Sequence, residues 1–170
     1  MTDLEEFRKQ KDEYLEHSSH SPLKPEQRQA FTGLRYFPEN PALDLTVSIL
    51  LFPGKQTIPM PTSTGAVQHY ERYGQFSFAI DGQTATLTFY RNANGYFLPF
   101  VDSLAGKETY AAGRYLEPKE LGAKKFQVNF NYAYNPYCAY NELWSCPIPP
   151  AENHLTLPIR AGEMIFAAHE

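Results

Sequence analysis

Residues 75–88 read Gln-Phe-Ser-Phe-Ala-Ile-Asp-Gly-Gln-Thr-Ala-Thr-Leu-Thr, two alternating segments on either side of Asp81-Gly82. Asp-Gly is a strong signal for a two-residue hairpin turn, because both residues tolerate the positive φ angles of a type I′ turn. With Ile80 opposite Gln83, every second pair falls on the same face of the hairpin. The sequence therefore predicts one buried face made of Phe76, Phe78, Ala85 and Leu87, and an opposite face that is mostly polar, with Ser77, Thr86 and Thr88.

Other segments share this period of two. Leu45, Val47, Ile49 and Leu51 alternate with Thr46 and Ser48, and Pro53-Gly54 predicts the end of that strand. Further strands are expected at residues 96–101, 126–130, 155–159 and 164–167, the first of them after a turn at residues 92–95. About six or seven short strands without helices between them predict an all-β fold, an antiparallel sheet closed as a small barrel or folded as a sandwich.

The amino-terminal residues predict a helix. Thr2-Asp3-Leu4-Glu5 is a capping box, and the pattern predicts a helix over residues 3–17 that ends by Pro22. Pro25 begins a second, shorter helix over residues 26–31. Because the apolar stripe of the first helix is narrow, we expect this helix to lie away from any ligand site. The chain then reads as a single domain, with a helical segment at 1–33 and a β-rich part at 34–170.

Composition limits the classes of function. The chain has 170 residues, of which 42% are hydrophobic, and 15 Lys and Arg against 19 Asp and Glu give a net charge of −4. This balance argues against a nucleic-acid-binding protein that neutralises phosphates. No apolar run is long enough to span a bilayer, and the first residues show no apolar signal core, so we expect a cytoplasmic protein without a membrane partner. The sequence does not indicate an oligomeric state.

Residues 130–153 have neither a helix nor a strand period and are dense in aromatic residues. A long connection of this kind is usually functional or disordered, and this one is too apolar for disorder. We therefore expect an ordered loop that covers a cleft for a small polar molecule. The candidate ligand-binding residues are Arg114, Asn131, Tyr134, Asn135, Tyr137, Asn141 and Asn153. The candidate catalytic residues are the carboxylates Glu152 and Glu163, which would transfer a proton.

Two other interpretations of the same residues stay open. In the first, the asparagines bond loop backbone and the tyrosines fill a core, with their hydroxyls at its edge. In the second, the aromatic loop docks a protein partner, and the chain is a non-catalytic interaction or structural module. An exposed Tyr and Trp patch would favour docking, whereas a concave loop with inward Asn and Glu would favour the cleft.

The two cysteines, Cys138 and Cys146, are too few for a disulfide framework. They read as small buried hydrophobes in a reducing compartment or as a short bridge in an oxidising one. With Glu152 and His154 they would form a metal set, but their spacing is not that of a zinc knuckle, so no metal is expected. As a nucleophile Cys138 would need a positioned histidine, for which His69 is the interior candidate.

No cofactor motif is visible. Gly106-Lys107 suggests a phosphate loop, but Val101 and Glu108 stand where such a loop needs Gly and Ser or Thr. An ion-pair network or a cation for an anionic ligand is the remaining interpretation of Lys107 and Arg114. No cofactor is therefore predicted.

Several motifs occur together along the chain: 131–141 (Asn-Tyr-Ala-Tyr-Asn-Pro-Tyr-Cys-Ala-Tyr-Asn), 146–153 (Cys-Pro-Ile-Pro-Pro-Ala-Glu-Asn), 106–110, 113–116 and 160–163 (Arg-Ala-Gly-Glu). Over residues 31–163 they resemble the prokaryotic family of uncharacterised proteins catalogued as domain of unknown function 1684. That family has an Arg after Glu-Asn where this chain has His154, which speaks against His154 as an essential ligand. The resemblance implies a map of motifs without an activity.

Overall fold

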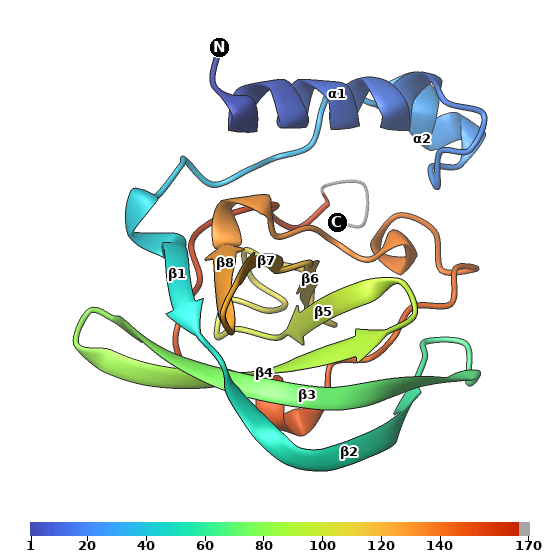
Figure 1. The fold of residues 1–170 in the computed structure, drawn as a ribbon. Helices are drawn as coiled ribbons and strands as arrows, with labels where there is room; N and C mark the ends of the chain where they lie inside the picture. Colours follow the sequence, from blue (N-terminus) through green and yellow to red (C-terminus); the bar gives the residue numbers. More distant parts are fainter. Residues whose placement is uncertain (167–170) are drawn as a thin grey trace.

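The computed structural model describes residues 1–166, which form two antiparallel sheets below two helices (Figure 1). The five-stranded sheet has the order β2-β3-β4-β5-β6 and the three-stranded sheet the order β1-β8-β7. In the larger sheet the strands are β2 (Leu50–Pro61), β3 (Val67–Ile80), β4 (Gln83–Asn92), β5 (Gly95–Phe100) and β6 (Arg114–Leu116). In the smaller sheet they are β1 (Asp44–Ser48), β7 (Lys119–Gly122) and β8 (Lys125–Asn129).

The β3–β4 hairpin has the predicted register. Asp81 and Gly82 have φ angles of 49° and 81°, as a type I′ turn requires. Phe76 pairs with Leu87 and Phe78 with Ala85, and all four side chains are buried. The opposite face differs from the expectation at Thr88, which is also buried, because a short helix of the later chain covers it.

A common core joins the two sheets. Phe89 of β4 meets Phe126 of β8 edge to face, with ring centroids 5.1 Å apart. Phe130, directly after β8, packs against Phe78 of β3 and Phe100 of β5. Strands β2 and β6 lie at opposite edges of the larger sheet and do not pair with each other within the described residues, so the expected all-β fold is confirmed as a sandwich-like arrangement and not as a closed barrel.

Two expectations about strands are wrong. Pro53-Gly54 does not end a strand, because β2 continues to Pro61 through an irregularity between Leu51 and Gln56. Proline is tolerated there because β2 lies at the edge of its sheet.

Residues 155–159 and 164–166 are not strands. Their backbone groups bond separate segments one at a time: Leu155 N–H donates to the Val101 carbonyl at 2.7 Å, and Met164 N–H to the Arg35 carbonyl at 2.9 Å. Ala167, the last residue of the second expected strand, lies outside the described residues.

The predicted helices are present as α1 (Asp3–His17) and α2 (Pro25–Ala30). The capping box of α1 forms as expected, with Thr2 and Glu5 bonding each other's backbone N–H. Helix α1 extends along one side of the sheets (Figure 1), where Leu15 packs with Leu23, Tyr140 and Phe166. Short 3-10 helices lie at η1 (Pro41–Leu43), η2 (Phe130–Tyr132), η3 (Tyr137–Ala139) and η4 (Ala151–Asn153). None of the helices within residues 1–166 is long and apolar enough to cross a membrane.

Candidate functional site

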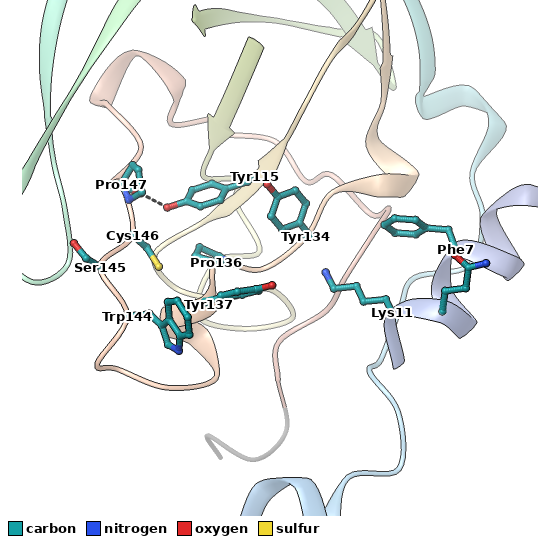
Figure 2. Close-up of a pocket in the computed structure, with 11 residues that line it drawn as sticks. Phe7, Lys11, Tyr115, Tyr134, Pro136, Tyr137, Trp144, Ser145, Cys146 and Pro147 are labelled. Atoms are coloured by element: carbon teal, nitrogen blue, oxygen red, sulfur yellow. Dashed lines mark hydrogen bonds between the residues drawn. The ribbon is translucent and has the colours of Figure 1, made fainter. Parts of the chain in front are cut away.

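A cavity of about 610 Å³ lies between helix α1 and the aromatic segment after β8 (Figure 2). Phe7, Gln10 and Lys11 of α1 form one side of it. Tyr115 of β6 and the rings of Tyr134 and Tyr137 form the opposite wall. The rim is made by Pro136 and by residues 144–147, Trp-Ser-Cys-Pro. Helix α1 therefore lines this cavity, and it is not peripheral to this candidate site as the sequence led us to expect.

Lys11 is the cation in the wall of this cavity. Its ammonium group forms an ion pair with Glu163 and lies 4.9 Å from the centre of the Tyr134 ring. The Glu163 carboxylate is buried, and it also accepts hydrogen bonds from the Tyr140 hydroxyl at 2.8 Å and the Asn135 N–H at 3.0 Å. Glu163 therefore reaches the cavity only through Lys11, and it fixes the position of the ammonium group.

The tyrosines line the cavity mainly with their rings. Burial raises the pKa of Tyr134 and of Tyr115, so both hydroxyls stay protonated at neutral pH. The Tyr134 hydroxyl donates to Glu117 at 2.5 Å, and the Tyr115 hydroxyl donates to the Pro147 carbonyl. Tyr137 meets Trp144 edge to face at 5.1 Å. The wall is thus a set of aromatic rings, of which Tyr115 and Tyr134 have their hydroxyls already bonded.

Arg114 lies within the core, away from this cavity. It is 0% exposed, and its guanidinium donates to the carbonyls of Ile159, Ala161 and Glu163 and to Asp102. Burial lowers the pKa of Arg114 to about 10, so it still carries its charge at neutral pH. Its donors hold the irregular segment 159–163 against β6, so its contacts are those of a scaffold residue.

Asn131 and Asn153 also bond backbone. Asn131 exchanges two hydrogen bonds with the backbone of Asn40, at 2.8 and 3.0 Å. Asn153 accepts from the Thr88 N–H and donates to the carbonyls of Thr88 and Pro99, and it is 0% exposed. It therefore fastens η4 onto the larger sheet between β4 and β5. Both amides serve the backbone, as the first open interpretation proposed.

Asn135 and Asn141 have local roles as well. The Asn135 side chain donates to the Met164 carbonyl at 3.0 Å, while its N–H donates to Glu163. Asn141 accepts from the Leu143 N–H at 3.1 Å and closes the turn before Trp144. Of the seven residues expected to bind a ligand, Tyr134 and Tyr137 are the two that line the cavity.

The two candidate catalytic carboxylates bind different partners. Glu152 accepts hydrogen bonds from the Arg72 guanidinium, with 2.8 Å between Nη2 and Oε1, and from the Tyr90 hydroxyl. Glu163 binds Lys11, Tyr140 and Asn135. The structure therefore does not bring them together as an acid and base pair.

We expect Glu152→Gln to flatten the acid side of the stability curve. Burial acts to raise the pKa of Glu152, but the hydrogen bonds from Arg72 and Tyr90 outweigh it and lower the pKa. Because the pKa of Glu152 is lower in the folded than in the unfolded chain, its ion pair stabilises the fold at pH values above the unfolded pKa, about 4.3. This stabilisation is lost as the pH falls through the folded pKa. The Glu152–Arg72 pair is partly exposed to solvent. At pH 7, Glu152→Gln should therefore lower the free energy of unfolding by about 1 kcal/mol or less.

Urea unfolding at pH 7 and at about pH 3 measures this difference. The wild type should lose more stability between the two than Glu152→Gln does. Glu142→Gln, an exposed position in the same segment, should keep the wild-type dependence. Equal acid losses in all three proteins would contradict the role given to Glu152.

The cysteines are both buried and both free, and Cys146 lies in the cavity wall. His154 is exposed, and its ring lies 3.3 Å from the Pro149 carbonyl. Within residues 1–166 no three His, Cys, Asp or Glu side chains are grouped so as to hold a metal ion.

Known proteins resemble this chain over most of its length. The model of the family described as Protein of unknown function (DUF1684) matches residues 29–164. The chain belongs to the DUF1684 family. No curated protein matched. The solution NMR structure of an uncharacterized protein from gene locus rrnAC0354 of Haloarcula marismortui is 32% identical, with a TM-score of 0.72, and the alignment covers 95% of this chain and 91% of that one.

The structure gives a physical reason for the glycine in the Arg-Ala-Gly-Glu motif at residues 160–163. Gly162 has a φ of 80°, and a Cβ atom there would lie 2.6 Å from the Ala133 carbonyl oxygen. Such a close approach leaves room only for glycine. Gly162 thus brings the Arg-Ala-Gly-Glu motif close to the loop after β8, while Arg114 binds the carbonyls of the same motif.

Sequence reasoning missed the part of this candidate site that comes from α1. Leu4, Phe7, Lys11 and Leu15 are spaced three or four residues apart and so share one helix face. A lysine within an otherwise apolar stripe was the available signal. Trp144, Ser145, Cys146 and Pro147 lay inside the aromatic segment but carried no ligand-binding pattern of their own.

Proposed function

We propose that this chain binds a small molecule with a flat aromatic body and one carboxylate in the cavity beneath α1. The observation that carries the proposal is the combination of aromatic walls with one cation, Lys11. A volume of about 610 Å³ is in the range of small-molecule sites. The expected ligand was a small polar molecule, but rings and prolines dominate the wall, which favours a mainly apolar body.

The position of Lys11 supports a carboxylate. An ammonium group has three N–H donors, and Glu163 accepts one of them from the buried side. The Lys11 side chain is 16% exposed, and in Figure 2 it extends from α1 toward Tyr134 and Tyr137. A ligand carboxylate lying on these rings would meet the ammonium group from the cavity side. The proposal is one of binding, because Glu152 and Glu163 do not form a catalytic pair.

The test uses 2-naphthoate as the probe, with isothermal titration calorimetry on the full chain. Removing a charge-assisted hydrogen bond costs about 1.5–3 kcal/mol, so loss of Lys11 should weaken binding by at least about tenfold. Because Lys11→Met alone would leave Glu163 buried without its cation, the double variant Lys11→Met with Glu163→Gln is used. Lys9→Met, an exposed lysine on the same helix, is the matched control and should bind as the wild type does.

The neutral analogue 2-naphthamide separates the two parts of the proposal. It should bind more weakly than 2-naphthoate to the wild type and equally to the double variant. If both probes bind the wild type equally, the carboxylate is the wrong head group. If neither probe binds while the thermal unfolding of the chain is normal, the proposal for an aromatic ligand is wrong.

The exposed apolar residues around Trp144 favour docking of a protein partner as a second candidate function. Leu143 is 82% exposed, Trp144 41% and Ile148 44%, and all three belong to the same segment. Apolar side chains so exposed are typical of interaction sites. Under this alternative, Leu143→Ser and Ile148→Ser would abolish partner binding and leave 2-naphthoate binding unchanged.

The thiols support placing the protein in the cytoplasm. Cys138 and Cys146 are both free, and disulfides are rare in a reducing compartment. Recovery of the native chain in the cytosolic fraction, with both thiols open to alkylation after denaturation, is the expected result.

A further inference from the structure

The two cysteines lie against each other across the turn formed by residues 138–146. The N–H of Cys138 donates to the sulfur of Cys146 at 3.2 Å. The two side chains share a buried cluster with Tyr115, and they are 8% and 7% exposed. Eight positions apart in sequence, these are the only two cysteines in the chain.

The surroundings make Cys138 the more reactive of the two thiols. The Tyr110 hydroxyl lies 3.7 Å from its sulfur. A hydrogen bond from the Cys146 thiol outweighs burial and lowers the pKa of Cys138, and the same contact raises the pKa of Cys146. The thiolate is the nucleophilic form of cysteine, so the environment favours attack by Cys138.

We propose that Cys138 and Cys146 are a redox-active pair that reduces small hydroperoxides, with Cys138 as the attacking and Cys146 as the resolving cysteine. The proposal rests on the contact of the two residues and on the Tyr110 hydroxyl beside the Cys138 sulfur. It is independent of the ligand proposed for the cavity. A positioned histidine is not needed, because the Cys146 thiol and the Tyr110 hydroxyl stabilise the thiolate.

The reaction balances in two steps. The Cys138 thiolate attacks the peroxide, an S–O bond forms as the O–O bond breaks, and the leaving alkoxide takes up a proton to become the alcohol. Cys138 is then a sulfenic acid. The Cys146 sulfur attacks it, the S–S bond forms, the S–O bond breaks and water leaves. Two thiols are oxidised by two electrons, and one hydroperoxide is reduced to an alcohol and water.

Formation of the disulfide would act on the cavity. Cys146 lies in the cavity wall. Its N–H donates to the Ser63 hydroxyl at 3.1 Å, and this hydrogen bond fixes Cys146 to the β2–β3 connection. Trp144, the single tryptophan of the chain, is two residues away. Its fluorescence therefore reports the state of the pair.

The experiment treats the reduced full chain with hydrogen peroxide and then alkylates the remaining thiols with N-ethylmaleimide. Intact mass spectrometry should show that the wild type loses both alkylation sites together, with a mass lower by two hydrogens, and that dithiothreitol restores them. Trp144 fluorescence should change with the same time course. Reduced glutathione under the same conditions is the reference for an ordinary thiol.

Single variants assign the roles. In Cys146→Ser the sulfenic acid on Cys138 should persist and be trapped by dimedone. In Cys138→Ser the remaining Cys146 should react about tenfold more slowly than Cys138 does in Cys146→Ser. Tyr110→Phe removes only one hydroxyl, so it should fold normally and slow the oxidation several-fold.

The wild-type measurement needs no variant and decides the proposal by itself. If both thiols of the wild type remain open to alkylation when glutathione is fully oxidised, the pair is not redox-active. If Cys138→Ser reacts as fast as Cys146→Ser while both melt as cooperatively as the wild type, the assigned order of attack is wrong.

Discussion

Replacing Arg114 with Met is expected to lower the free energy of unfolding by about 3–5 kcal/mol, because it leaves a buried charge without its partner. The removed guanidinium now binds Asp102 and three backbone carbonyls, and no part of it is exposed. Sequence reasoning alone placed Arg114 among the candidate ligand-binding residues. In the structure its guanidinium bonds the scaffold, and the expected loss of stability follows from these contacts.

Urea denaturation followed by circular dichroism measures the loss. Arg91→Met is the matched control, because the ion pair of Arg91 with Glu71 lies at the surface, with the arginine side chain 38% exposed. Its loss should be within about 1 kcal/mol. Arg114→Lys should remain strongly destabilised, since a lysine cannot bond several carbonyls with one planar group. Equal losses in Arg114→Met and Arg91→Met would contradict the buried role of Arg114.

Replacing Phe130 with Ala is expected to cost about 3–5 kcal/mol through the cavity that it leaves in the core. Phe130 is 0% exposed. The centroid of its ring lies 5.5 Å from the ring centroid of Phe78 and 5.4 Å from that of Phe100. It stands where β8 leads into the loop after it, so it joins the two sheets to the signature segment.

Chemical denaturation of Phe130→Ala and of Leu143→Ala gives the comparison. Leu143 is 82% exposed, so its truncation should change stability by no more than about 0.5 kcal/mol. A loss in Phe130→Ala as small as that would show that the two sheets do not depend on this residue for their packing.

The Arg114→Met and Phe130→Ala variants should also affect the cavity. The walls of the cavity come from α1, β6 and the segment after β8, and Arg114 and Phe130 hold the last two in place. A ligand site of this kind depends on residues that never touch the ligand. This dependence explains why Tyr134 and Tyr137 line the cavity, whereas the other residues expected to bind a ligand bond the surrounding chain.

Local features of the fold follow from neighbouring residues. Asp81-Gly82 and the alternation around it were enough for the register of the β3–β4 hairpin, because turn type and side-chain period are decided within a few residues. The capping box at Thr2 likewise specified where α1 begins. The family signature was legible in the same way, since its motifs are contiguous runs.

Other features depended on contacts between distant parts of the chain. Residues 155–159 and 164–166 alternate like strands, yet they and the residues between them bond four separate segments, at residues 35–37, 101–103, 108 and 133, instead of one neighbouring strand. Lys11 meets Glu163 across 152 positions, and together with the packing of Leu15 on Tyr140 this contact holds α1 over the aromatic segment, where the cavity lies. Turns and caps are decided by short-range sterics and hydrogen bonds, whereas the burial of Arg114, Asn153 and Glu163 is decided by which segments the whole chain packs together.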